Sequence, residues 1–223
     1  MKNNTNEKIV IIFDFDGTMY SGKHKFDNIP PAIETARRLF LPQLDDKEYS
    51  DICREFPEWN RVTSGKDIVD VIYAIKERYP SYAISPTSFW EWQNNSRYDI
   101  IIDENEVIDI DYLHGLCDNY PVYIVSNSSP NHLKHYMNKL SIPCAWFKDI
   151  ISNRFEEYDR TKEHYYKDIL DIESAKPSNT VVIGDSDISD LEPARRLGIE
   201  TIYIDNANDI PTAVNKFLEE REN

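Results

Sequence analysis

Cysteine is scarce in this sequence, and long hydrophobic runs are absent from it. The three cysteines, Cys53, Cys117 and Cys144, form no CxxC pair, so neither a zinc site nor a disulfide framework is expected. Residues 1–8 are polar, and the apolar run that follows, 9–13, is too short for a signal-peptide core or a membrane span. Together these features predict a protein of the reducing cytoplasm that has no membrane partner.

Positive charge is also in short supply. The chain has 25 Lys and Arg against 40 Asp and Glu, which gives a net charge of −15 at pH 7. Such an acidic surface repels nucleic acid and anionic membranes, so we expect no nucleic acid as a partner. A phosphorylated small molecule is not excluded, because local cations can reverse the field at a site. The 223 residues suffice for one substantial core, or for a core with a smaller inserted domain.

Short runs rich in Ile and Val recur along the chain and are typical of strands in a parallel sheet that is buried on both faces. They lie at 9–13, 122–125, 181–183 and 201–204. Helical patterns separate or follow them at 130–140, 161–172 and 190–197. Thr161 is a candidate N-cap, and Gly198 a candidate helix stop. This alternation predicts an α/β fold with a doubly wound parallel sheet.

The segment 20–115 has a different character. It contains helical patterns, such as 64–78, and little that resembles the strands of the core. We interpret it as a mainly helical domain inserted between the first and second strands of the core. The predicted core then consists of 1–19 and 116–223.

The first strand run ends in two carboxylates, Asp14 and Asp16, which point the same way because a strand alternates its faces. Two like charges so close together are costly unless they share a cation or a proton, so the pair suggests chemistry. Asp14 is the candidate nucleophile, which would attack phosphorus and form an aspartyl-phosphate. Asp16 is the candidate general acid and base, which would protonate the leaving oxygen and then activate water. Gly17 would let the backbone turn tightly beside the substrate.

Two other strand runs end in polar residues that would fall at the same edge of the predicted sheet. Ser126 and Asn127 offer a hydroxyl, an amide and backbone N–H groups to phosphate oxygens. Asp185 offers an oxygen ligand that, with Asp14 and backbone or water oxygens, would suit Mg²⁺. Asp190 is either a further ligand or a residue that orients a metal-bound water.

Three segments resemble motifs of the haloacid dehalogenase-like superfamily. Residues 14–18, DFDGT, resemble its first motif, DxDGT. Residues 125–127, VSN, resemble its second motif, and residues 184–190, GDSDISD, resemble its fourth. The three occur in the family's order, and the resemblance covers the predicted core.

The third motif of that family is a lysine, usually at the start of a helix that precedes the fourth motif. Lys162 opens a predicted helix and lies 23 positions before Asp185 (185 − 162 = 23). Lys176 is the alternative, because Pro177 follows it and a Lys-Pro pair is common in this motif. It lies only 9 positions before Asp185 (185 − 176 = 9), with no room for a helix between them. We choose Lys162 as the catalytic and phosphate-binding lysine.

The resemblance implies a Rossmann-like core, a type 1 cap between the first two motifs, and an aspartyl-phosphate intermediate. It also implies Mg²⁺ held by Asp14, Asp16, Asp185 and Asp190. Because the dehalogenase branch usually lacks the second aspartate, Asp16 favours phosphate transfer over dehalogenation. We therefore expect a phosphatase for a small phosphorylated metabolite. A phosphomutase or phosphotransferase, or a non-catalytic module that binds a phosphorylated ligand, are the alternatives; the sequence indicates neither the substrate nor the oligomeric state.

Each signal has a structural alternative. Asp16-Gly17 is a common turn pair, and Asp185 could cap a helix. The occurrence of all the signals together and in order favours the catalytic interpretation. His132 and His135 lie three positions apart on a predicted helix, and we expect both on its solvated face.

Overall fold

The computed structural model describes residues 8–24, 100–128, 130–152 and 160–222, together with residues 47, 54 and 77. The chain divides into two compact units. The first consists of Met1–Lys23, Ile100–Ser152 and Arg160–Asn223, and the second of His24–Asp99 and Asn153–Asp159. Most of the expected inserted domain lies outside the described residues, so its helical character stays a prediction.

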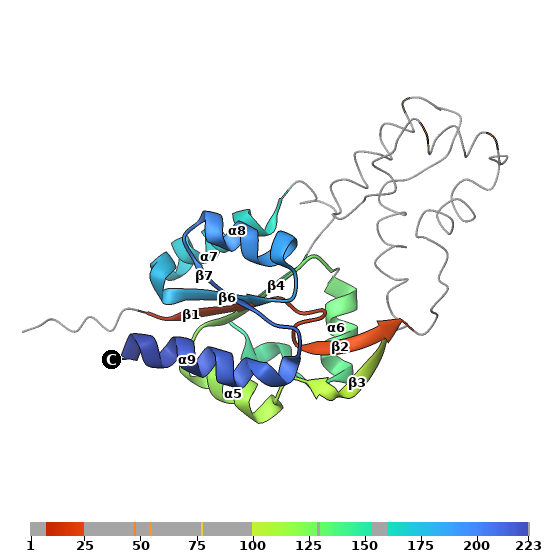
Figure 1. Ribbon diagram of the computed structural model, residues 1–223, viewed down its shortest axis with the longest axis horizontal. Coiled ribbons are helices and arrows are strands. Elements are labelled where there is room, and N and C mark those ends of the chain that lie inside the picture. Colours follow the sequence, from red (N-terminus) through yellow and green to blue (C-terminus); the bar gives the residue numbers. More distant parts are fainter. Residues whose placement is uncertain are drawn as a thin grey trace, which may run out of the picture. The chain divides into compact units, whose positions relative to one another are not determined.

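A five-stranded parallel sheet forms the centre of the first unit (Figure 1). The strand order is β5–β4–β1–β6–β7, which puts β1 in the middle. The strands are β1 Val10–Phe13, β4 Val122–Ser126, β5 Asp149–Ser152, β6 Thr180–Gly184 and β7 Glu200–Tyr203. Four of them cover the Ile- and Val-rich runs of the sequence. The sheet and its flanking helices confirm the predicted Rossmann-like, doubly wound α/β fold.

Helices cover both faces of the sheet. In Figure 1, α7 and α8 lie on one face, and α5 and α9 lie on the other. The α-helices are α5 Ile110–Asn119, α6 Pro130–Lys139, α7 Lys162–Glu173, α8 Glu192–Arg196 and α9 Ile210–Glu222. Shorter helical turns are η3 Cys144–Trp146, η5 Pro177–Asn179, the π-helical η6 Asp187–Leu191 and η7 Ala207–Asp209. None of the described helices combines the length and the apolar character that a membrane crossing requires.

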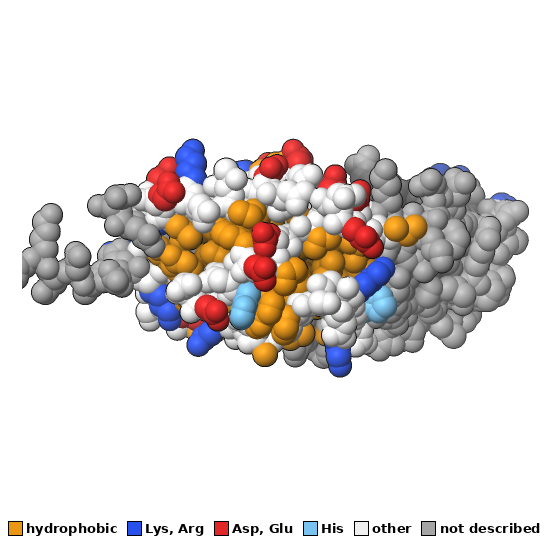
Figure 2. Space-filling model, turned by 90° about the horizontal axis from the view of Figure 1, so that it is seen from below, with side chains coloured by type: hydrophobic (Ala, Val, Ile, Leu, Met, Phe, Trp, Pro, Cys, Tyr) orange, Lys and Arg blue, Asp and Glu red, His pale blue; other side chains and the backbone are white. Residues whose placement is uncertain are grey.

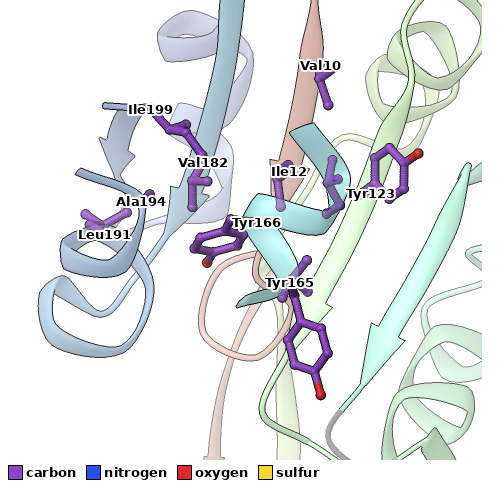
Figure 3. Close-up of a cluster of buried hydrophobic side chains, with 11 residues drawn as sticks. Val10, Ile12, Tyr123, Tyr165, Tyr166, Val182, Leu191, Ala194 and Ile199 are labelled. Carbon is purple, nitrogen blue, oxygen red and sulfur yellow. The ribbon is translucent and has the colours of Figure 1, made fainter. Parts of the chain in front are cut away.

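The surface seen from below Figure 1 lies on the α5 and α9 side of the sheet. Apolar side chains there are interspersed with acidic and basic ones (Figure 2). On the opposite face of the sheet, buried hydrophobic side chains form a core cluster. Val10, Ile12 and Val182 project from β1 and β6 toward Tyr166 of α7 and Ala194 of α8, and all five are fully buried (Figure 3). Burial of each Val or Ile side chain in this cluster contributes about 1.5–3 kcal/mol.

Helix α7 begins where the sequence predicts. Thr161 is its N-cap residue, and the N–H of Thr161 donates to Nδ1 of His164 over 3.1 Å. Lys162 is the first residue of the helix, so this cap fixes the point from which the Lys162 side chain departs.

The helix predicted at 190–197 has a different form. The segment begins as the π-helical turn η6, and α8 covers only Glu192–Arg196. Ser186 caps the turn, because its Oγ accepts a hydrogen bond from the N–H of Ser189 over 3.2 Å. The wider turn shifts the start of the regular helix beyond Asp190.

The sequence pattern assigns 20–115 to the inserted domain, but both ends of that range belong to the first unit. Strands β2 (Tyr20–His24) and β3 (Ile100–Val107) form a two-stranded sheet. Tyr20 is buried and stacks on Tyr136 of α6, with ring centroids 5.5 Å apart and planes 14° from parallel. Tyr20, the first residue of 20–115, therefore belongs to the core, because its side chain packs against Tyr136.

Candidate active site

Three polar residues meet at one edge of the sheet because β4, β1 and β6 are parallel neighbours. Asp14 follows β1, Ser126 ends β4, and Asp185 follows β6. The N–H of Asp14 donates to the carbonyl of Ile183 over 2.8 Å, which holds Asp14 against β6. The residues thus lie at the carboxyl edge, where the sequence pattern predicts a ligand site.

An acidic cluster is formed by Asp14, Asp185 and Asp190, each of which contributes one carboxylate oxygen to a group lying within 4.8 Å of one another. Asp14 and Asp190 are buried, and Asp185 is partly exposed. Nζ of Lys162 donates to Oδ1 of Asp14 and to Oδ1 of Asp190, each over 2.6 Å. Thr18 Oγ1 lies 3.4 Å from Oδ2 of Asp14 and 3.4 Å from Oδ1 of Asp185. The lysine therefore joins two of the three carboxylates.

Negative charge exceeds positive charge in the acidic cluster. Burial raises the pKa of Asp14, and the ammonium group of Lys162 offsets that effect only in part. Burial, followed by the charge of Asp190, also raises the pKa of Asp185. Burial alone would lower the pKa of Lys162, but Asp14 and the other neighbours outweigh it and raise that pKa, so the lysine stays charged. A divalent cation would relieve the remaining repulsion, and carboxylate oxygens are ligands that suit Mg²⁺.

The π-helical turn η6 brings Asp190 back to the edge of the sheet. Oδ2 of Asp190 accepts from the N–H of Ser186 over 3.0 Å, and Oδ1 accepts from Oγ of Ser189 over 2.8 Å. With the Lys162 contact, both oxygens of Asp190 are engaged by donors of the chain itself. These contacts are 3.0 Å or shorter, whereas Thr18 Oγ1 lies 3.4 Å from Oδ2 of Asp14 and 3.4 Å from Oδ1 of Asp185. Asp190 therefore suits the role of an anchor for Lys162, and Asp14, through Oδ2, and Asp185 suit direct metal binding.

Two glycines allow the close approach of these loops. Gly17 has a φ of +80°, and a Cβ atom added there would overlap Oδ2 of Asp185. A Cβ added at Gly184 would lie 2.7 Å from Cβ of Asp190. Both positions exclude larger side chains, so the glycines set how near the acidic side chains come to β1 and β6.

Asp16 has partners of its own. Its Oδ1 accepts from the hydroxyl of Tyr20 over 2.5 Å and lies 2.6 Å from Nε2 of His132, while Oδ2 accepts from Oγ of Ser128 over 2.5 Å. Burial would raise the pKa of Asp16, but hydrogen bonds to His132, Ser128 and Tyr20 outweigh burial and hold that pKa below its usual value. The sequence pattern includes Asp16 among the metal ligands. In the structure its carboxylate is not one of the three that converge, because its oxygens face these other partners.

The remaining predicted residues are divided between the two ends of the sheet. Ser126 is buried, and its Oγ accepts from the N–H of Ser128 over 3.0 Å. Asn127 is exposed beside it at the same edge. Lys176 is exposed at the start of η5, before β6, and so lies at the opposite end of that strand. The structure thus brings Lys162, and not Lys176, to the acidic cluster.

Several side chains at the site have contacts that the sequence pattern does not reveal: Thr18, Tyr20, Ser128 and His132. The expectation that His132 faces solvent is wrong, because its side chain is fully buried against Asp16. A usable signal was its position in the first turn of α6, the helix that follows β4 and therefore starts at the carboxyl edge of the sheet.

A family model described as haloacid dehalogenase-like hydrolase matches residues 10–198 of the chain. No curated protein matches it. Among solved structures, 2-haloacid dehalogenase from Pseudomonas syringae pv. Tomato DC3000 has a TM-score of 0.57 at 14% identity, covering 94% of this chain and 99% of that chain.

Two further structures are similar over nearly their whole length. A haloacid dehalogenase-like family hydrolase from Xanthomonas campestris has a TM-score of 0.55 at 14% identity, covering 97% of this chain and 98% of that chain. The HAD-hydrolase YfnB from Bacillus subtilis, solved bound to magnesium, has a TM-score of 0.51 at 17% identity, with coverages of 94% and 99%. At these identities the similarities support the fold, while the family model matches most of the sequence. The chain belongs to the haloacid dehalogenase-like hydrolase family.

Proposed function

We propose that the protein is a Mg²⁺-dependent phosphatase that hydrolyses a small phosphorylated metabolite through an aspartyl-phosphate on Asp14. The observation that carries this proposal is the presence of two carboxylates with separate surroundings. Asp14 is held by Lys162 in the acidic cluster, and Asp16 is held two residues further on by Tyr20, Ser128 and His132. One carboxylate can then serve as nucleophile and the other as acid and base.

The oxygen donors of the acidic cluster fit Mg²⁺. Asp14 and Asp185 would hold the ion, because Lys162, Ser186 and Ser189 contact both oxygens of Asp190 at 3.0 Å or less. Oδ2 of Asp14, by comparison, is 3.4 Å from the hydroxyl of Thr18. Mg²⁺ usually binds one or two carboxylates and completes its shell with water and substrate phosphate. When bound, it would supply positive charge against the phosphate oxygens. The magnesium in the structure of YfnB supports this assignment.

In the first step, a carboxylate oxygen of Asp14 would attack phosphorus as the bond to the ester oxygen breaks. Asp16 would give its proton to that oxygen, so the leaving group departs as an alcohol. A phosphate dianion bound beside Asp16 favours the protonated form that this step needs. Lys162 would balance part of the charge on the transferring group, and Ser126 and Asn127 would donate hydrogen bonds to its oxygens.

In the second step, water would attack the same phosphorus. Asp16, now a carboxylate, would accept the proton of that water as the bond between phosphorus and Asp14 breaks. Inorganic phosphate is then released, and both aspartates return to their starting forms. Without Asp16 the aspartyl-phosphate would form slowly with most esters and would persist.

The unit formed by 24–99 and 153–159 is proposed as a mainly helical cap that selects the substrate. Its insertion into a core of this family supports that role. The chemistry proposed above depends on residues of the first unit alone.

The function is tested by phosphate release from an aryl phosphate and from a panel of phosphorylated sugars, nucleotides and organic acids, with and without Mg²⁺. We expect Mg²⁺-dependent release that Asp14→Asn abolishes. No release from any ester, or release that survives Asp14→Asn, would contradict the proposal. Halide release from a 2-haloacid would favour a dehalogenase instead, and transfer of the phosphoryl group to an added acceptor would favour a phosphotransferase.

A further inference from the structure

His132 and Asp16 lie 116 positions apart in the chain, yet Nε2 of His132 is 2.6 Å from Oδ1 of Asp16. We propose that His132, together with Tyr20 and Ser128, is a positioning residue that holds the Asp16 carboxylate in the orientation required for proton transfer. This inference rests on the proposed function. It adds that a histidine outside the family's motifs controls the acid-base step.

The three partners approach Asp16 from different elements. Tyr20 begins β2, Ser128 lies in the loop after β4, and His132 lies in the first turn of α6. Oδ1 receives Tyr20 and His132, and Oδ2 receives Ser128, so both oxygens are held. A short carboxylate side chain held at both oxygens has little freedom to change rotamer.

The direction of the His132 contact follows from chemistry. An ionised carboxylate can only accept hydrogen bonds, so Nε2 of His132 must carry the proton and donate it to Oδ1 of Asp16. Tyr20 and Ser128 donate through their hydroxyl groups. These three donors orient the carboxylate of Asp16 in its charged form, which is the form that accepts a proton in the second step.

Burial is unequal within this contact. The His132 side chain is 0% exposed, whereas the Asp16 side chain is 26% exposed. The histidine thus acts from the protein interior, and Asp16 keeps an open side from which a leaving oxygen or a water could reach it. This arrangement is expected when a buried residue, His132, positions a catalytic side chain, Asp16, that must reach the substrate.

Tyr136 holds two of the three partners in place. Its ring lies 4.8 Å from the ring of His132 and stacks on the ring of Tyr20 at 5.5 Å. One buried aromatic side chain of α6 therefore fixes both donors to Oδ1 of Asp16. The rate of proton transfer falls steeply when the acid is misplaced. Loss of the contacts that hold Asp16 is therefore expected to lower the rate of the chemical step.

The test compares His132→Phe, which keeps a ring of similar volume without a donor, with His132→Gln, which restores an N–H near the position of Nε2. For a phosphate ester with a poor leaving group, we expect His132→Phe to lower kcat by about 100-fold while KM stays within about twofold. His132→Gln should recover most of that loss. His114→Phe, the same change at an exposed histidine of α5, should keep wild-type kcat.

Leaving-group dependence separates positioning from a general structural defect. An aryl phosphate with an acidic leaving group needs little proton donation, so His132→Phe should still give a rapid burst of aryl alcohol followed by slow turnover. In an Asp16→Asn background, adding His132→Phe should cost less than about twofold more, because His132 acts through Asp16. A burst that is slowed as much with the acidic leaving group as with the poor one, or fully additive losses in the double variant, would overturn the proposal.

Two further measurements test the proposal if His132→Phe does not fold or if the wild type shows no phosphatase activity. If His132→Phe does not fold, Ser128→Ala removes the donor to Oδ2 and should shift kcat and the leaving-group dependence in the same way. If the wild type releases no phosphate from any ester, the proposed function is wrong, and ¹⁵N NMR of the imidazole still tests the contact. Asp16→Asn should then move the Nε2 resonance of His132, and an unchanged resonance would overturn the positioning role by itself.

Discussion

Lys162 joins Asp14 to Asp190, because its Nζ lies 2.6 Å from Oδ1 of each carboxylate. All three side chains are almost fully buried, with exposed fractions of 3%, 8% and 2% respectively. The capped first turn of α7, the end of β1 and the π-helical turn η6 meet at this one ammonium group. The contact therefore links three elements of the fold to the candidate nucleophile.

Lys162→Met should damage both stability and activity. Removing one partner of a buried ion pair leaves carboxylates without compensation and costs about 3–5 kcal/mol. Loss of the charge should also lower turnover by at least about 100-fold. Denaturant unfolding and phosphate release measure the two effects. Lys176→Met is the matched control, since Lys176 is exposed at the other end of β6. Greater damage from Lys176→Met would show that the family's lysine is wrongly assigned to Lys162.

Gly17→Ala should disable the site and leave the fold largely intact. The backbone at Gly17 is left-handed, and a Cβ there would overlap Asp185, so the acidic cluster must shift. A displacement of about 1 Å can cost roughly 100-fold in rate. Gly115→Ala is the control, because nothing lies within 4 Å of a Cβ added there in α5. That change should leave turnover unaltered, and similar turnover in both variants would count against the described loop geometry.

Mg²⁺ should stabilise the protein through the acidic cluster. Binding to the folded state alone adds about 2.7 kcal/mol when the free ion is at 100 times its Kd. The melting temperature should rise with Mg²⁺, fall again on addition of a chelator, and respond little to Mg²⁺ in Asp185→Asn. Asp187→Asn is the control, because Asp187 pairs with Arg195 at the surface outside the cluster. An equal response to Mg²⁺ in the two variants would place the ion elsewhere.

Glu173 should contribute to the loss of folding stability at acid pH. It lies at the amino ends of the strands, where Tyr123 and Lys8 contact its carboxylate. Burial would raise the pKa of Glu173, but hydrogen bonds from Lys8 and Tyr123 outweigh burial and lower it from the ordinary 4.5. A lowered folded-state pKa means that the carboxylate stabilises the fold above pH 4.5, and that this contribution is lost as the pH falls through the folded-state pKa.

The measurement is the free energy of unfolding as a function of pH for the wild type and for Glu173→Gln. The variant should be less stable than the wild type above pH 4.5, and the difference should shrink on acidification. Glu104→Gln, at an exposed position of β3, should keep the wild-type slope. A difference that stays constant with pH would show that Glu173 contributes through packing alone.

The acidic cluster could be predicted from the sequence because it depends on strand ends. The apolar runs before Asp14 and Asp185 predict parallel strands, and parallel neighbours place their following residues at one edge. The partners of Asp16 could not be predicted in this way. Ser128 and His132 reach it through the path taken by the loop after β4, which hydrophobic periodicity does not report.

The sequence pattern does not predict β5, α9 or the place of Tyr20, and the three cases differ. Strand β5 is short and half-exposed at the edge of the sheet, so Asp149–Ser152 shows no long apolar run. Helix α9 carries a usable signal, since Ile210, Val214 and Phe217 recur at helical spacing and are buried. The sequence pattern assigns Tyr20 to the inserted segment, because a lone aromatic residue does not reveal that it stacks on Tyr136.

Covalent chemistry at Asp14 is the central claim, and rapid acid quench followed by peptide mass spectrometry tests it most directly. With Mg²⁺ and an aryl phosphate, Asp16→Asn should accumulate a phosphoryl group on the peptide that contains Asp14. The wild type should show the same adduct only transiently before releasing phosphate. Wild-type turnover without any phosphoryl adduct on Asp14 in either protein would contradict the account.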